Sequence, residues 1–129
     1  MVHKRNPIDD NPDTVLNERQ ALEMAEGSPF CSHAYAAFQT EDYYLFYVMD
    51  YLRGGDVYDA FETLGIANNL KPADLSMIRI LSAELLCGLK HLHSRGVVHR
   101  DLKIDNILVD TRFKMPIRCV SNQVFGSNM

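Results

Sequence analysis

The sequence has few cysteines and no pair of them at metal-binding spacing. Its three cysteines, Cys31, Cys87 and Cys119, are odd in number and far apart. A disulfide framework needs paired cysteines, and a zinc ribbon needs closely spaced Cys-x-x-Cys motifs. Neither is indicated here, and a reducing intracellular compartment is the expected location.

Long hydrophobic runs and an excess of positive charge are also missing. No apolar run approaches the ~18 residues of a membrane span, and the polar opening MVHKRNPIDDNP does not match a signal peptide. The net charge of -4 argues against nucleic acid or an anionic membrane, because both favour a basic surface. We therefore expect a cytoplasmic protein with no membrane segment and no nucleic-acid partner.

The residues that are present indicate a globular domain. The chain has 129 residues, of which 47% are hydrophobic and 23% charged. These proportions are typical of one soluble domain, or of a piece of one.

A helix is expected to begin near Asn11, because Asn is a favoured N-cap and Pro12 suits the first helical position. Its apolar face carries Val15 and Leu22, and Glu18 lies on the same stripe. Buried carboxylates are rare without a partner. Spacing alone therefore favours a position for Glu18 at the edge of the stripe, in water.

Two aromatic-rich stretches between residues 30 and 49 flank the polar QTED and predict a β-hairpin. The paired glycines of RGGD then end the sheet, and a short helix over DVYDAFETL follows. The longest helix runs over LSMIRILSAELLCGLKHLHSRG, with apolar residues at helical spacing and Gly96 as its stop. Cys87 and His91 share one face of this helix, but without a second ligand cluster a surface histidine is favoured over a metal site.

The stretch VVHRDLKIDNILVD places polar residues between two short β runs, which we expect to pair. It matches the template H-R-D-L-x-x-x-N at His99, Arg100, Asp101, Leu102 and Asn106. Phosphoryl transfer needs a carboxylate for the substrate proton, a cation for the phosphate charge and an oxygen ligand for Mg²⁺. Asp101, Lys103 and Asn106 suit these roles in that order, and the alternative is a coincidental charged turn.

The sequence resembles the catalytic domain of protein kinases. FQTEDYYLFYVMDYLRGGD is similar to the strand and hinge of the AGC group of Ser/Thr kinases, and ELLCGLKHLHSRGVVHRDLKIDN resembles the protein kinase C family. The resemblance implies an α+β fold that is a fragment of the two-lobed protein-kinase-like fold. Residues 1–110 would form the partial kinase domain, and residues 111–129 an irregular tail.

The resemblance also implies a set of binding residues. Met49 matches the gatekeeper, Asp50 and Leu52 would present backbone groups to adenine, and Asp56 would lie near the ribose and near basic substrate residues. Glu18 matches an inward glutamate that pairs with a strand lysine, which reverses the expectation from spacing. Leu22 and Leu108 match apolar spine positions, and Ala34 is smaller than the usual residue. The implied cofactors are ATP and Mg²⁺, and the implied partner is a protein substrate.

Some parts of the family pattern do not occur in this sequence. It has no Gly-rich loop and no Asp-Phe-Gly triplet after Val109, and the strand lysine would precede Met1 unless Lys4 replaces it. We therefore expect a truncated Ser/Thr kinase domain that is inactive alone. The alternative is a pseudokinase-like interaction module without catalytic activity.

Overall fold

The structure is a computed structural model that describes residues 2–5, 12–41, 44–66, 68–72, 74–110 and 118–119. For residues 2–5, 12–17 and 118–119 it describes the backbone alone. The elements follow in the order β1 (Val2–Arg5), α1 (Pro12–Met24), β2 (Ala34–Gln39), β3 (Leu45–Met49), α2 (Val57–Thr63), α3 (Asp74–Ser94), a 3₁₀ turn η1 (Ile104–Asn106), β4 (Ile107–Leu108) and β5 (Arg118–Cys119).

Three strands form an antiparallel sheet in the order β1-β3-β2. β2 and β3 are the expected hairpin, and their turn includes Thr40, whose N–H donates to the carbonyl oxygen of Tyr44 at 3.0 Å. One face of β3 is more deeply buried than the other, because Tyr47 and Met49 are buried while Phe46 and Val48 are partly exposed.

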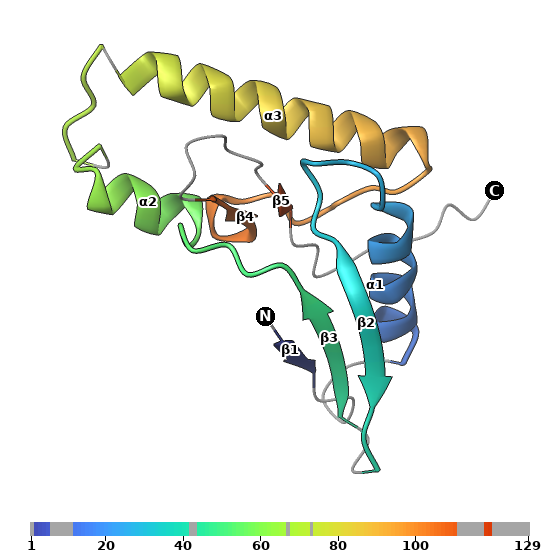
Figure 1. The fold of residues 1–129 in the computed structure, drawn as a ribbon. Helices are drawn as coiled ribbons and strands as arrows, with labels where there is room; N and C mark the ends of the chain where they lie inside the picture. The colour runs from blue at the N-terminus through green and yellow to red at the C-terminus, as the bar shows by residue number, and fades with distance from the viewer. Residues whose placement is uncertain are drawn as a thin grey trace.

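Helix α1 lies against this sheet (Figure 1). Leu22 of α1 packs with Tyr47 and Met49 of β3 in one buried cluster. The helix was expected from its capping residues and it begins at Pro12, while the proposed N-cap Asn11 lies outside the described residues. This packing fixes α1, and with it Glu18, on the sheet.

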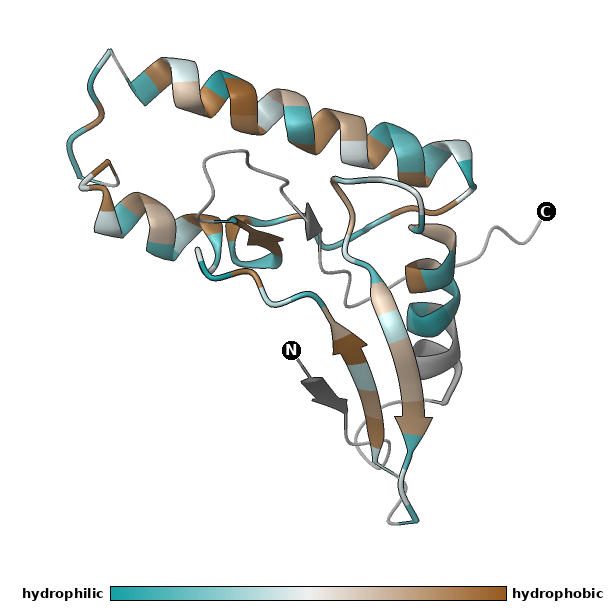
Figure 2. Cartoon of the chain, viewed as in Figure 1, coloured by the Kyte–Doolittle hydropathy of each residue, from teal (hydrophilic) through white to brown (hydrophobic). Residues whose placement is uncertain are grey.

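Helix α3 spans the opposite end of the molecule, with α2 and β4 beneath it (Figure 1). Hydrophobic and hydrophilic residues alternate along α3 (Figure 2). Its buried residues join two clusters, one with α1 and one with α2 and β4. The first cluster contains Ala21, Ala25, Cys31, Leu92 and Val97, and the second contains Val57, Leu81, Ile107 and Val109. As expected, Gly96 ends the helix in a left-handed conformation, with φ 76°.

The end of the described chain differs from the sequence interpretation. β4 pairs with β5, with Ile107 opposite Cys119 and Leu108 opposite Arg118. The expected pairing of β4 with the Val97–Val98 run is therefore wrong, because the partner strand comes later in the sequence. β5 lies inside the segment expected to be an irregular tail. The domain boundary at residue 110 stays a prediction.

Candidate active site

Asp101, Lys103 and Asn106 lie together on the loop between α3 and β4. The Nδ2 group of Asn106 donates to the Oδ2 atom of Asp101 at 2.9 Å and to its backbone carbonyl oxygen at 2.8 Å. The Lys103 Nζ atom lies 3.5 Å from the same Oδ2 atom. The side chains of Lys103 and Asp101 are 52% and 42% exposed, whereas Asn106 is buried. The buried amide therefore holds a carboxylate that faces solvent.

The backbone of this loop is tightly turned. The Asp101 N–H donates to the carbonyl oxygen of His99 at 2.9 Å, and Arg100 between them has φ 61°. A left-handed conformation is uncommon for a residue other than glycine, and such residues cluster at functional sites. His99 is only 2% exposed, so it anchors the start of the loop in the interior. The loop is therefore fixed on both sides of Asp101, by His99 and by Asn106.

Three of the expected ATP-binding residues, Asp50, Leu52 and Asp56, lie on the segment between β3 and α2, here called the hinge (residues 50–56). Met49 at the end of β3 and Leu52 are buried. Asp50 accepts a hydrogen bond on Oδ1 from the Tyr35 hydroxyl group at 2.5 Å. Asp56 caps α2, because its Oδ1 atom accepts a hydrogen bond from the Asp59 N–H at 2.8 Å. The sequence interpretation missed this capping role.

Backbone hydrogen bonds join the hinge to β4. The Gly54 N–H donates to the carbonyl oxygen of Val109 at 3.0 Å, and the Val109 N–H donates to the carbonyl oxygen of Gly55 at 2.9 Å. Asp56 and Leu108 form an antiparallel bridge beside these bonds. A Cβ atom on Gly54 would lie 2.3 Å from the Val109 carbonyl oxygen, so only glycine fits here. The structure thus brings the hinge residues and Leu108 together.

Glu18 is buried on the sheet side of α1, with 3% of its surface exposed. The position in water that spacing favoured is therefore wrong, and the inward position implied by the kinase resemblance is correct. A buried carboxylate requires a compensating partner. Lys4, the proposed alternative partner, lies on β1 opposite Phe46, and its side chain is outside the described part of the chain.

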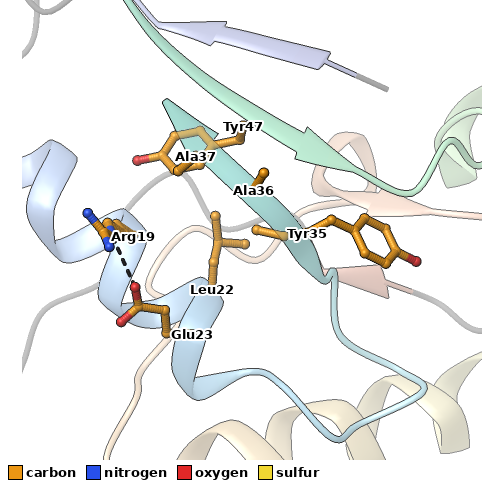
Figure 3. Close-up of a pocket in the computed structure, with 8 residues that line it drawn as sticks. Arg19, Leu22, Glu23, Tyr35, Ala36, Ala37 and Tyr47 are labelled. Atoms are coloured by element: carbon orange, nitrogen blue, oxygen red, sulfur yellow. Dashed lines mark hydrogen bonds and ion pairs between the residues drawn. The ribbon is translucent and has the colours of Figure 1, made fainter. Parts of the chain in front are cut away.

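A cavity of about 220 Å³ lies between α1 and the β2–β3 hairpin (Figure 3). Of the residues named from the kinase resemblance, its lining includes Leu22 and Ala34. Three alanines of β2 leave the space open, and the Arg19–Glu23 ion pair lies at its side, with Arg19 Nε 3.0 Å from Glu23 Oε1. The lining residues are Arg19, Leu22, Glu23, Ala34, Tyr35, Ala36, Ala37 and Tyr47.

Burial also affects one thiol near the end of α1. Cys31 is 2% exposed, and its Sγ atom lies 3.7 Å from the Gly88 carbonyl oxygen of α3. Desolvation raises the pKa of the Cys31 thiol, while the Ser28 hydroxyl and the Arg95 charge oppose this shift.

In the described part of the chain, no group of three or more His, Cys, Asp or Glu residues could hold a metal ion. The preference for a surface histidine over a metal site at Cys87 and His91 stays a prediction.

Comparison with known proteins identifies the family. The family model for the protein kinase domain matches residues 1–119. The chain belongs to the protein kinase domain family. It is 39% identical over 103 residues to human protein kinase C delta type, covering 80% of this chain and 14% of that protein. It is 38% identical over 110 residues to the serine/threonine-protein kinase cek1 of Schizosaccharomyces pombe, covering 84% of this chain and 8% of that protein.

A third relative is the probable serine/threonine-protein kinase pkgA of Dictyostelium discoideum, which is 38% identical over 109 residues, 84% of this kinase chain and 7% of that protein. The kinase chain thus spans only a small part of the curated relatives it matches. The expected resemblance and the α+β kinase-fragment fold are confirmed. Among the described residues, no helix is both long and apolar enough to cross a membrane.

Proposed function

We propose that the chain is part of an ATP-dependent Ser/Thr protein kinase, which transfers the γ-phosphoryl group of ATP to a hydroxyl group of a protein substrate. The arrangement of Asp101, Lys103 and Asn106 carries this proposal. In the pattern Asp-x-Lys-x-x-Asn, the Asp101 Oδ2 atom lies 3.5 Å from the Lys103 ammonium group and 2.9 Å from the Asn106 carboxamide nitrogen. The Ser/Thr kinases among the relatives support the same class.

Asp101 is the proposed general base. Its Oδ2 atom is held by Asn106 and faces Lys103, so the carboxylate has a fixed orientation before substrate binds. A positioned carboxylate within hydrogen-bond reach of a substrate hydroxyl group accepts its proton as the new P–O bond forms. Lys103 offsets the negative charge on the transferred phosphoryl group.

The residues at this loop suit Mg²⁺ and ATP. Because the Asn106 Nδ2 group donates to Asp101, its Oδ1 atom is directed elsewhere, and carboxamide oxygens are ligands for Mg²⁺. Asn106 is therefore the proposed metal ligand in this chain. When bound, Mg²⁺ neutralises charge on the phosphates. The solvent-exposed side of Asp101 leaves room for these groups.

The hinge is the proposed adenine site. Asp50 and Leu52 would supply backbone groups to the base, and Met49 and Leu108 would supply apolar side chains to its site. The bridge between Asp56 and Leu108 supports this assignment, because it joins the hinge to the strand that follows Asn106. Glu18 is the proposed partner of a lysine on the phosphates, and its burial supports that role.

Phosphoryl transfer by this chain alone is not part of the proposal. The sequence contains no Asp-Phe-Gly triplet, which supplies a further Mg²⁺ ligand in kinases. The test is therefore binding: the melting temperature of the purified 129-residue chain is measured with and without ATP and Mg²⁺. Ligand that binds the folded chain stabilises it, so we expect a rise of several degrees.

The double variant Asp101→Asn, Asn106→Ala should reduce this rise, whereas Asp105→Asn, on an exposed neighbour in the same turn, should keep it. Comparing the ligand-dependent shift within each variant removes any effect on the ligand-free protein. No shift in the wild-type chain, or an equal shift in the double variant, would contradict the proposed nucleotide site. A folded chain that binds no ATP would instead favour the interaction module.

A further inference from the structure

Tyr35 occupies an irregular position in β2. Ala34 pairs with Met49 and Ala36 pairs with Val48, so Tyr35 is the extra residue of a β-bulge opposite the end of β3. A bulge bends its strand and redirects the side chain of the extra residue, and bulges recur beside active sites. Tyr35 points away from Leu22 and Tyr47 at the cavity (Figure 3).

The bulge brings the Tyr35 side chain to the start of the hinge. Its hydroxyl group donates to the Oδ1 atom of Asp50 at 2.5 Å, and Asp50 is the residue that directly follows β3. The His33 ring contacts the Tyr35 ring edge-on, with centroids 4.6 Å apart and planes at 90°. One contact thus restrains the ring of Tyr35, and a hydrogen bond to an ionised acceptor restrains its hydroxyl group.

The two ends of the hinge are held differently. The far end is fixed by the backbone hydrogen bonds of Gly54 and Gly55 with Val109. The near end continues from buried Met49 into Tyr51, which is 68% exposed. A tyrosine from the neighbouring strand that binds the side chain of Asp50 restrains the backbone at this near end.

We propose that Tyr35 is a positioning residue that sets the backbone conformation of residues 50–52, and thereby the affinity of the hinge for an adenine base. This inference rests on the proposed function of the hinge. Tyr35 does not touch the base and acts through Asp50. The side chain of Tyr35 is 62% exposed, so the bond competes with water and its effect is modest.

The first test needs no nucleotide. Amide hydrogen exchange is measured in the ligand-free 129-residue chain for the wild type, for Tyr35→Phe and for Tyr58→Phe as the matched control. Tyr58 lies on α2, is exposed, and its hydroxyl group has no hydrogen bond within the described residues. Exchange at residues 50–52 should become roughly two- to fivefold faster in Tyr35→Phe, in line with one exposed hydrogen bond. Tyr58→Phe should leave it unchanged.

The second test asks whether the hinge conformation affects base binding. Dissociation constants are measured for ATP, for adenosine and for inorganic triphosphate. If Tyr35 acts on the base contact, Tyr35→Phe should raise the dissociation constants of ATP and adenosine by the same factor, roughly two- to fivefold. The dissociation constant of inorganic triphosphate should stay unchanged. Asp50→Ala should raise the dissociation constants of ATP and adenosine by a similar factor. Because Tyr35 acts through Asp50, the double variant Tyr35→Phe, Asp50→Ala should bind no more weakly than Asp50→Ala alone.

The outcomes separate this inference from the function on which it rests. If the wild-type chain binds neither ATP nor adenosine, the proposed function fails, and exchange at residues 50–52 still decides whether Tyr35 positions the hinge. Unchanged exchange there, or a uniform increase along the whole chain, overturns the role of Tyr35. Faster exchange with unchanged adenosine affinity overturns the role in base binding.

Discussion

The N–H group of Gly54 donates to the carbonyl oxygen of Val109 at 3.0 Å, and this contact leaves no space for a side chain. It ties the segment that follows β3 to the end of β4. Both segments carry residues of the candidate active site, so the geometry of that site depends on a backbone contact between them.

Replacing Gly54 by alanine should therefore destabilise the chain. The added Cβ atom would lie 2.3 Å from the Val109 carbonyl oxygen, so the hinge must move away from β4, at a cost of about 1–3 kcal/mol in the free energy of unfolding. Gly65→Ala is the control, since open space surrounds Gly65 and only its positive φ of 70° opposes alanine. Urea unfolding measures both variants. Equal losses in the free energy of unfolding of the two variants would contradict a destabilising clash between the added Cβ atom at Gly54 and Val109.

Asn106→Ala should loosen the loop at Asp101. The substitution removes two hydrogen bonds, to the Asp101 carbonyl oxygen and Oδ2 atom, and leaves a buried space. We expect a loss of about 1–2 kcal/mol in the free energy of unfolding, measured by urea without ligand. Asp105→Ala removes an exposed side chain of the same turn and should change the free energy of unfolding by less than about 0.5 kcal/mol. A loss in Asp105→Ala as large as that in Asn106→Ala would contradict this account.

Arg95, the residue directly after α3, should stabilise the end of α1. Its Nη1 atom donates to the carbonyl oxygens of Met24 at 2.7 Å and Glu26 at 2.5 Å. These groups lie at or just beyond the helix C-terminus, where a cation satisfies carbonyls and complements the dipole. Arg95→Met should lower the free energy of unfolding by about 1 kcal/mol and speed amide exchange in the last turn of α1.

Arg79→Met is the matched control for Arg95, because Arg79 lies on α3, is exposed and makes no ion pair within the described residues. Arg79→Met should leave both the free energy of unfolding and the amide exchange in the last turn of α1 unchanged. High salt should narrow the difference between wild type and Arg95→Met, since the charge–dipole part is screened. A difference that salt does not alter would assign the effect to hydrogen bonding alone.

The buried Cys31 thiol should make the stability of the folded chain fall as the pH rises above about 9. Burial raises its pKa above the ordinary value of 9.0, so the unfolded chain loses this proton at lower pH than the folded chain. Stability from the neutral thiol is therefore complete below about pH 9 and is lost as the pH rises toward the folded pKa. The Cys31→Ser variant has no thiol to ionise at this position. Its free energy of unfolding should therefore fall less between pH 8 and 10 than that of the wild type, and the difference is the contribution of Cys31. Parallel curves for the two proteins would contradict this assignment.

Local patterns in the sequence identified the parts of the structure that depend on neighbouring residues. The position of Pro12 at the start of α1, the apolar spacing of α3 and the position of Gly96 are short-range signals, and each corresponds to an observed feature. The loop at Asp101 was identified in the same way, because its three polar side chains occur within six residues. The roles assigned to them stay predictions.

Contacts between distant residues could not be read from the same patterns. The burial of Glu18 depends on how α1 packs on the sheet, and spacing alone gave the wrong position. The pairing of β4 with β5 was missed because β5 has only two residues and follows a polar stretch. The bulge at Tyr35 depends on the register between two strands, to which the residue type of Tyr35 gives no signal.

The contact between Gly54 and Val109 also has a consequence for synthesis of the chain. All of α2 and α3 lies between the two residues, so the ribosome releases the hinge long before its partner strand. Closing this long loop carries an entropic cost that local helix formation does not, and contacts of this kind slow folding. The hinge therefore acquires its final conformation only after α3 and β4 have been made, which places it late in the maturation of the protein.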